Sequence, residues 1–206
     1  MLIYLMRHGE TVANRTRHLQ GWLDSPLTDF GRELATATGK GMKKAGITFD
    51  IAFTSPLCRA TETCRRVLDE CGCENLVPIE DYRLREGCSG KWEDTTDPRI
   101  DPSSPVPVEF LERYFRNAFL IESFPGGDNP HTTIQRAQDF LRQISVLDCR
   151  SVLVSSHGFC LRCMLNSLFP DPSDFWQGQM PPNCSVCIVE SDGRRLRLLE
   201  KDKMFY

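Results

Sequence analysis

Short apolar segments alternate with helical segments along this chain, and that alternation constrains its fold more than any other feature. Four runs bounded by turn signals are predicted to be buried strands, at residues 1–6, 50–54, 76–79 and 151–155. Helices are predicted at about 28–45 and 55–71, with Thr28 and Ser55 as N-caps, and from the fourth strand to residue 168. Strands that alternate with helices predict a mostly parallel sheet covered on both faces.

Two regions depart from this alternation. Residues 185–190 and 195–199 flank Asp192-Gly193, a hairpin signal that predicts an antiparallel strand at the edge of the sheet. Residues 90–129 are rich in proline, helical around 108–121, and turn again at residues 125–127. We interpret 90–129 as a small insertion or lid near the active site, within a single domain that spans residues 1–206.

The composition excludes several classes of protein. With 206 residues, 40% of them hydrophobic, the chain can bury one full core. Its 25 Lys and Arg against 28 Asp and Glu leave no basic surface for nucleic acid. No apolar run reaches the roughly 18 residues that span a bilayer, and residues 1–6 lack the charged leader of a secretory signal. We expect a cytoplasmic protein with no nucleic-acid or membrane partner, and its oligomeric state stays open.

Ten cysteines are the unusual count in this composition. In a chain of this length without a secretory signal, we expect reduced thiols. Cys160 and Cys163, with Cys184 and Cys187, have nearly the spacing of a zinc ribbon. The first pair falls in a predicted helix and the second in a predicted strand, where residues three apart face opposite sides. We therefore favour buried small apolar side chains over a zinc site and predict no bound metal.

Charged and histidine side chains follow the predicted strands where each strand ends, and ligands bind beyond the carboxyl ends of parallel strands. Two arginines suit a phosphate dianion. A neutral histidine can attack phosphorus, a second can donate to the phosphoryl oxygens, and a carboxylic acid can protonate the leaving oxygen. This set fits phosphoryl transfer without a metal or other cofactor. The residues, in strand order, are Arg7 and His8, then Arg59, then Glu86, then His157.

Several motifs stand in a fixed order along the chain. Residues 7–11 read Arg-His-Gly-Glu-Thr, residues 20–28 read Gln-Gly-Trp-Leu-Asp-Ser-Pro-Leu-Thr, and residues 54–63 read Thr-Ser-Pro-Leu-Cys-Arg-Ala-Thr-Glu-Thr. The series continues with Leu-Arg-Glu at 84–86, Gly-Lys-Trp-Glu at 90–93, Pro-Gly-Gly at 125–127, Ser-His-Gly at 156–158 and Asn-Cys-Ser at 183–185. Together the motifs resemble those of the histidine phosphatase superfamily, which includes the phosphoglycerate mutases, over essentially the whole chain.

The resemblance implies a three-layer α/β/α sandwich, in agreement with the predicted strands and helices. It implies that His8 is the nucleophile and Glu86 the proton donor, and that Arg7, Arg59 and His157 complete the phosphate pocket. It further implies contacts to the phosphate or the rest of the substrate from a second group of residues. These are Asn14, Gln20 and Gly21, with the backbone at Gly158 and Phe159. His18 and His131 follow no predicted strand, so we expect both at the surface.

Three functions stay open. We favour a phosphatase that acts on a small phosphorylated metabolite, because the insertion is short and residues 86–93 resemble the α-ribazole phosphatase group and related broad-specificity phosphatases. The insertion also lacks paired arginines like a mutase carboxylate clamp, for which Arg113 and Arg116 are the nearest candidates. One alternative is a cofactor-dependent phosphoglycerate mutase. Another is a catalytically idle protein of the same fold that only binds phosphoesters. The absence of a G-x-x-x-x-G-K-[ST] motif excludes a P-loop enzyme.

Overall fold

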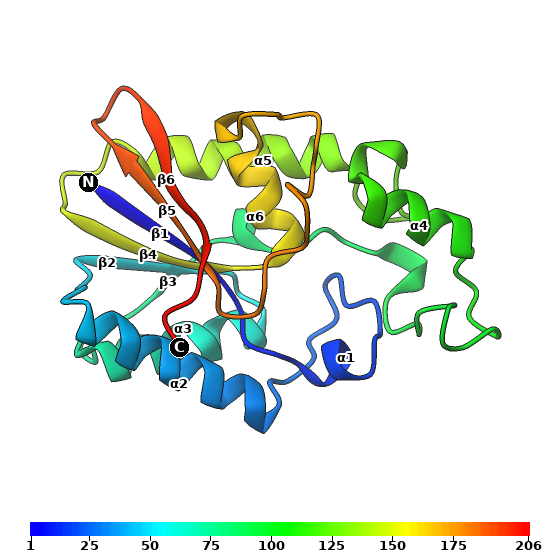
Figure 1. Cartoon of the computed structure of the whole chain (residues 1–206), viewed down its shortest axis with the longest axis horizontal. Helices are drawn as coiled ribbons and strands as arrows, with labels where there is room; N and C mark the ends of the chain where they lie inside the picture. Colours follow the sequence, from blue (N-terminus) through cyan, green and yellow to red (C-terminus); the bar gives the residue numbers. More distant parts are fainter.

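A six-stranded mixed sheet runs through the centre of the computed structural model, which describes residues 1–206 (Figure 1). The strands lie in the order β3-β2-β4-β1-β5-β6. The first four are parallel, and β5 pairs antiparallel with both β1 and β6, so the predicted sheet with an antiparallel edge is confirmed. The bounds are β1 (Leu2–Arg7), β2 (Ile51–Thr54), β3 (Ile79–Glu80), β4 (Ser151–Ser156), β5 (Val186–Ser191) and β6 (Leu196–Lys203).

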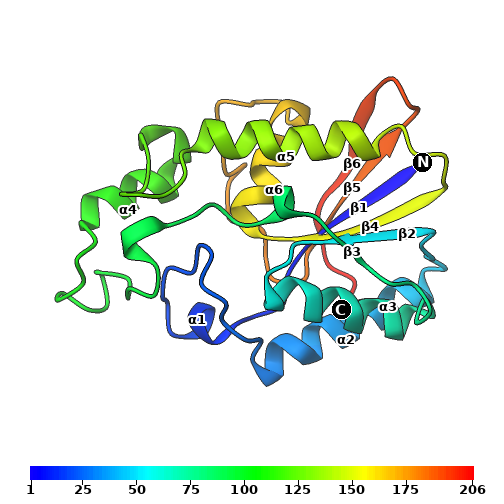
Figure 2. The same ribbon diagram turned by 180° about the vertical axis from the view of Figure 1, so that it is seen from behind.

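Helices cover both faces of the sheet and complete the predicted three layers (Figure 2). On one face, α2 (Asp29–Lys44) and α3 (Cys58–Cys71) enclose a cluster of 14 buried residues. On the other, α5 (Pro130–Ile144) and α6 (Gly158–Leu165) enclose a cluster of 24. The short helices α1 (Val12–Arg15) and α4 (Val108–Arg116) lie together at one end of the molecule. No helix of the structure has both the length and the apolar character needed to cross a membrane.

The register of the central strands sets the position of the site. Arg7 on β1 is paired with Ser156 on β4, and Thr54 on β2 is paired with Ser155. The parallel strands therefore end side by side, and the residues that follow them emerge at one edge of the sheet. This places His8 and His157 next to one another, with ring centroids 5.2 Å apart.

The predicted caps are right for α2 and wrong for α3. Thr28 caps α2 by accepting a hydrogen bond from the Gly31 N–H, and Gly46 ends the helix region in a left-handed conformation with φ of +70°. α3 begins at Cys58, and Ser55 is not its N-cap. The Ser55 side chain is fully buried and bonds to His157 instead. The Ser55 hydroxyl, which the sequence predicted to cap α3, is used in a tertiary contact with His157.

Other element bounds differ from the prediction in ways that the local chain explains. The helix predicted around 108–121 stops at Arg116, because Asn117 is extended and its side chain accepts from the Phe119 N–H. α6 ends at Leu165 and continues as a 3₁₀ turn to Leu168. α5 was not predicted, although Asn129 caps it and Pro130 fills its first turn.

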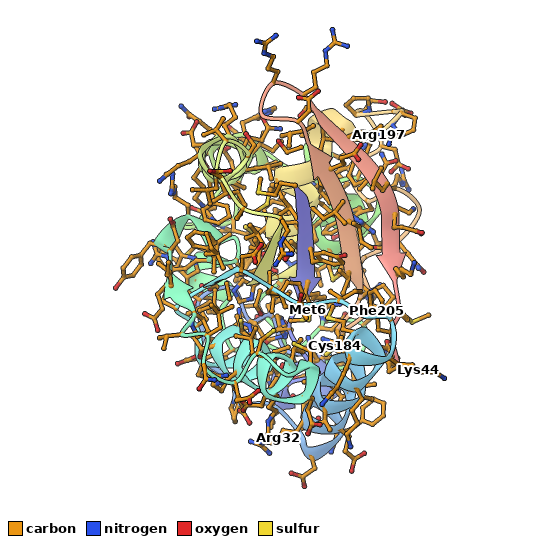
Figure 3. All side chains as sticks on the ribbon, turned by 90° about the vertical axis from the view of Figure 1, so that its left-hand side faces the viewer. Met6, Arg32, Lys44, Cys184, Arg197 and Phe205 are labelled. Atoms are coloured by element: carbon orange, nitrogen blue, oxygen red, sulfur yellow. The ribbon has the colours of Figure 1, made fainter.

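The four cysteines whose spacing resembles a zinc ribbon lie in two different cores. Cys160, Cys163 and Cys187 belong to the cluster under α5 and α6, whereas Cys184 belongs to the cluster under α2 and α3. Figure 3 shows Cys184 beside Met6, close to Phe205 near the end of the chain. The sheet separates Cys184 from the other three, so the four thiols do not converge as a tetrahedral zinc site requires. All ten cysteines are free thiols.

Two glycines let the segment after β1 lie directly on the start of α2. A Cβ on Gly31 would lie 2.1 Å from the Glu10 carbonyl oxygen, and one on Gly9 would lie 2.5 Å from the Gly31 carbonyl oxygen. Both contacts are with backbone, which cannot swing aside as a side chain can. The chain can therefore follow this path around His8 only because both positions are glycine.

We predict that Gly31→Ala destabilises the protein by about 2 kcal/mol or more, because the added methyl must push the Glu10 backbone away from α2. Chemical unfolding monitored by circular dichroism measures the change. Lys40→Ala, at an exposed position of the same helix, is the matched control and should change stability by less than about 0.5 kcal/mol. Equal stability of the two variants would contradict the close approach.

Candidate active site

A cavity of about 150 Å³ lies at the carboxyl end of the parallel strands. It is bordered by segments that follow β1, β2, β3 and β4, together with residues of the insertion, as expected for a site at this edge of the sheet. Most of the site residues predicted from the sequence line it: Arg7, His8, Asn14, Gln20, Gly21, Arg59, Glu86 and Phe159.

The His8 ring is held in one tautomer. Its Nδ1 donates to the Gly9 carbonyl oxygen at 2.7 Å, which leaves Nε2 unprotonated and without a protein partner. The side chain is buried, and burial, followed by the charges of Arg59 and Arg7, holds the pKa of His8 well below its usual value. A neutral imidazole with a free ring nitrogen is the form that can act as a nucleophile.

Arg59 is fully buried and is fixed on three sides. Its Nη1 donates to the Leu23 carbonyl at 2.7 Å and its Nη2 to the Gly21 carbonyl at 2.8 Å. Its Nε faces Nδ1 of His157 at 3.2 Å. Each terminal nitrogen keeps a second N–H, and the guanidinium borders the cavity, so Arg59 can bind an anion without moving.

His157 is close to the predicted pocket but does not border the cavity. Since Arg59 donates to its Nδ1, the proton lies on Nε2, which donates to Ser55 Oγ at 2.7 Å. Burial and the charge of Arg59 hold the pKa of His157 well below its usual value, so the ring is neutral. Both ring nitrogens are thus engaged inside the protein, and no N–H is free for the predicted bond to a phosphoryl oxygen. In this arrangement, His157 positions Arg59.

Arg7 lines the cavity and keeps one terminal nitrogen free there. Its Nη1 donates to the Pro181 carbonyl oxygen, its Nε is buried without a hydrogen-bond partner, and its Nη2 makes no hydrogen bond and is not buried. Burial lowers the pKa of Arg7, but an arginine starts from so high a value that it stays charged. The charged Nη2 group can therefore donate to the oxygen of an anion bound in the cavity.

Glu86 accepts three backbone hydrogen bonds. Its Oε1 accepts from the N–H groups of Cys160 at 2.9 Å and Gly87 at 3.1 Å, and its Oε2 accepts from Phe159 at 3.2 Å. The Phe159 N–H, predicted to contact the phosphate or the rest of the substrate, therefore binds the carboxyl group of Glu86 at the first turn of α6. The Phe159 ring lines the cavity instead.

Gly158 is at the border of the site without lining the cavity. A Cβ there would lie 3.3 Å from the Met180 side chain and 3.5 Å from Arg7 Nε. Gly158 therefore lies beside Met180 and Arg7, and a Cβ would be slightly tight against Met180 and in ordinary contact with Arg7.

Arg136 on α5 holds the Glu86 loop in place and was not predicted from the sequence. Its Nη1 donates to the carbonyl oxygens of Arg83 and Arg85, and its Nη2 donates to that of Glu86 at 2.8 Å. Trp22 Nε1 donates to the same Glu86 oxygen, also at 2.8 Å. These bonds satisfy the carbonyls of the loop and aim the Glu86 side chain into the cavity. An arginine within an unpredicted helix gave no signal of this role.

The three predicted residues of the segment after β1 form a linked wall. Thr11 Oγ1 donates to Gln20 Oε1 at 2.8 Å, which turns the Gln20 amide nitrogen away from Thr11. Asn14 Oδ1 accepts from the Thr11 N–H and from Asn183, so its amide nitrogen is the free end. Gly21 has a positive φ of +50° and presents its carbonyl to Arg59. A Cβ at Gly21 would lie 2.4 Å from Glu93 Oε1.

The rest of the lining was missed from the sequence, and four of its nine residues lie in the insertion. Burial raises the pKa of Tyr114 well above 10, so its phenol stays neutral. His18 also lines the cavity and is half-buried, so its predicted placement at the surface is wrong, whereas His131 is exposed as predicted. The missed lining residues are His18, Leu19, Gly87, Ser89, Tyr114, Phe115, Phe124, Asp128 and Met180. They follow no strand end, and aromatic residues in an insertion give no signal that distinguishes a site from a core.

These features define an α/β protein with an anion pocket built around a neutral histidine at the end of its central strand. The chain belongs to the histidine phosphatase superfamily, branch 1, whose family model matches residues 3–202. No three of its His, Cys, Asp or Glu side chains converge as metal ligands.

Relatives of this chain include both a mutase and a phosphatase. The 2,3-bisphosphoglycerate-dependent phosphoglycerate mutase of Brucella anthropi is 34% identical over 169 residues, which cover 81% of this chain and 80% of the mutase. The structure of Bacillus stearothermophilus YhfR superposes with a TM-score of 0.84 at 29% identity, over 98% of this chain and 97% of that one. A mycobacterial glucosyl-3-phosphoglycerate phosphatase, solved with VO3, gives a TM-score of 0.81 at 25% identity over 98% of each chain.

The depressed pKa values of His8 and His157 predict how stability depends on pH. Below about pH 6.5 the unfolded chain protonates both rings while the folded protein keeps them neutral, so stability falls as the pH falls. Each histidine contributes up to about 1.4 kcal/mol per pH unit to this slope. We expect His8→Gln to show a shallower loss of stability than the wild type between pH 6.5 and 5, and the double variant with His157→Gln a shallower loss still.

Urea unfolding at a series of pH values measures the slope. Gln135→Ala, at an exposed position of α5, is the control and should keep the wild-type slope. If His8→Gln also keeps it, the ring is not held neutral by its surroundings.

Proposed function

We propose that this protein is a metal-independent phosphomonoester hydrolase that acts on a small phosphorylated metabolite through a phosphohistidine at His8. The observation that carries the proposal is the state of that ring. It is neutral and has a free Nε2 at a cavity bordered by the buried Arg59 and the partly buried Arg7. Arg7 supplies its unpaired Nη2, and Arg59 supplies its remaining donors, to the phosphoryl oxygens. His157 keeps Arg59 oriented.

Glu86 transfers the proton in both half-reactions, as the acid in the first and as the base in the second. In the first, the Nε2 lone pair of His8 forms a bond to phosphorus, the ester P–O bond breaks, and the acid form of Glu86 protonates the leaving oxygen. In the second, the Glu86 carboxylate takes a proton from water, whose oxygen bonds to phosphorus as the P–N bond breaks and its electron pair returns to Nε2. Oε2 of Glu86 has only one N–H partner and therefore has room for the proton.

The arginines of the insertion favour hydrolysis over isomerisation. Arg113 and Arg116, the candidates for a carboxylate clamp, are both exposed and neither lines the cavity. Arg7 and Arg59 are the only arginines that line it, and part of the wall is formed by the aromatic side chains of Tyr114, Phe115, Phe124 and Phe159. A phosphoglycerate carboxylate would therefore lack a cationic partner beside the phosphate. These observations support a phosphatase, as does the likeness to the mycobacterial phosphatase.

We predict that the purified protein releases phosphate from small phosphomonoesters without added metal and in the presence of chelator, and that His8→Ala abolishes the release. Glu86→Gln should lower kcat/KM for alkyl phosphates by about 10²–10⁴-fold, because an alkoxide needs a proton to leave. The loss should be much smaller for 4-nitrophenyl phosphate, whose leaving group needs little protonation. Phosphate release measured by a colorimetric assay gives both ratios.

Equal losses for both substrates would remove Glu86 from the role of proton donor. Full activity of His8→Ala would remove His8 from the role of nucleophile. Binding of phosphomonoesters without turnover of any of them would favour the alternative of a catalytically idle binder.

A phosphoglycerate mutase is the second candidate, and the 34% identity to the Brucella anthropi mutase favours it. The deciding assay supplies 3-phosphoglycerate, with 2,3-bisphosphoglycerate as the primer, and follows 2-phosphoglycerate and free phosphate together. We expect phosphate release to exceed isomerisation, because the missing clamp leaves the acceptor weakly held. Isomerisation much faster than phosphate release would overturn the phosphatase.

A further inference from the structure

A second cavity, of about 240 Å³, lies directly beside the catalytic one. The two share the lining residues Asn14, His18, Leu19 and Phe115. The second cavity contains none of the phosphate-binding arginines. Its remaining lining residues are Ala13, Arg17, Asp97, Arg99 and Leu111.

The walls of this second cavity are built by the insertion against the segment that follows β1. Residues 17–19 pair with residues 94–97 through three backbone hydrogen bonds of 2.9 Å, which join Leu19 N to Thr95 O, Asp94 N to Leu19 O and Asp97 N to Arg17 O. His18 and Thr96 form a β-bridge, and their side chains lie 3.2 Å apart. The opposite wall is Leu111 and Phe115 on α4.

The second cavity is lined by two arginines and one carboxylate. Asp97 is buried and accepts from Arg99 Nε at 2.9 Å and 3.1 Å, and this bond lowers the pKa of Asp97, so the two charges cancel. Arg99 also lies over the Phe115 ring, 5.4 Å from its centroid, which fixes its position. Arg17 is exposed and has no side-chain hydrogen bond and no ion pair in the protein, although its charge also helps to lower the pKa of Asp97. Its guanidinium is thus available to a ligand.

We infer that the second cavity is a subsite for an anionic group at the far end of the substrate, a carboxylate or a second phosphoryl group, bound by Arg17. The inference rests on the proposed function, since the phosphoester group occupies the first cavity. The body of such a substrate crosses Leu19 and Phe115, and both of these side chains are apolar. This subsite differs from a clamp beside the phosphate, because Arg17 does not border the catalytic cavity.

A series of alkyl phosphates tests the subsite. Each n-alkyl phosphate is compared with the phosphate of the same chain length that carries a terminal carboxylate, and with the α,ω-bisphosphate. We expect the ratio of kcat/KM values for the carboxylate over the alkyl compound to pass through a maximum of about tenfold or more at one chain length. For the α,ω-bisphosphate, kcat/KM is divided by two because the molecule has two reactive ends. Comparing this value with that of the carboxylate compound shows which anion the subsite prefers.

Three variants assign the effect to its residue. Arg17→Gln should reduce the maximal ratio to near one while hydrolysis of the n-alkyl phosphates is unchanged, and Arg17→Lys should retain part of it. Arg15→Gln is the matched control, because Arg15 lies in the same segment, pairs with Glu10 at 3.0 Å and borders neither cavity. A ratio that does not vary with chain length, or one that survives in Arg17→Gln, overturns the subsite.

The n-alkyl arm keeps this test separate from the proposed function. If the wild type hydrolyses n-alkyl phosphates but shows no carboxylate preference, only the subsite is wrong. If it hydrolyses none of the compounds, the phosphatase is wrong. In that case, calorimetry measures the affinities of wild type and Arg17→Gln for each n-alkyl phosphate and its carboxylate counterpart. The ratio of the two affinities then tests the subsite.

Discussion

The buried guanidinium of Arg59 is the interaction on which the rest of the site depends. It binds the carbonyls of Gly21 and Leu23 and one nitrogen of His157, so it joins the segment after β1 and the end of β4 to α3. Its charge also helps to hold the pKa of His8 down. A positive charge without solvent is costly unless an anion is near. The same constraint therefore orders the pocket, keeps its nucleophile neutral and selects a ligand with negative charge.

The proton donor depends on contacts that are far away in the chain. Glu86 is positioned from behind by Arg136 on α5 and Trp22, and from in front by the first turn of α6. α5 and α6 cover the face of the sheet that lies opposite α2 and α3, so Glu86 and Arg59 rest on different cores. The sheet between them fixes the distance from the nucleophile to the acid.

The sequence was sufficient to predict the groups that strand ends bring together, because the edge of a parallel sheet places His8, Arg59 and Glu86 by topology alone. It was insufficient to predict the hydrogen-bond partner of a group that has several possible partners. Ser55 reads as a helix cap but bonds to His157, and the Phe159 N–H binds Glu86 in place of a phosphate. The second cavity was also beyond prediction, because residues 17–19 and 94–97 meet only through the path of the insertion.

Trapping the phosphoenzyme tests the central claim most directly. Wild-type protein mixed rapidly with a phosphomonoester and quenched in alkali should carry one phosphoryl group that is stable to alkali and lost in acid, as a phosphohistidine is. Peptide mapping should place it on His8. Turnover of the substrate with no phosphoenzyme at any quench time, or with the phosphoryl group on another residue, would contradict the account.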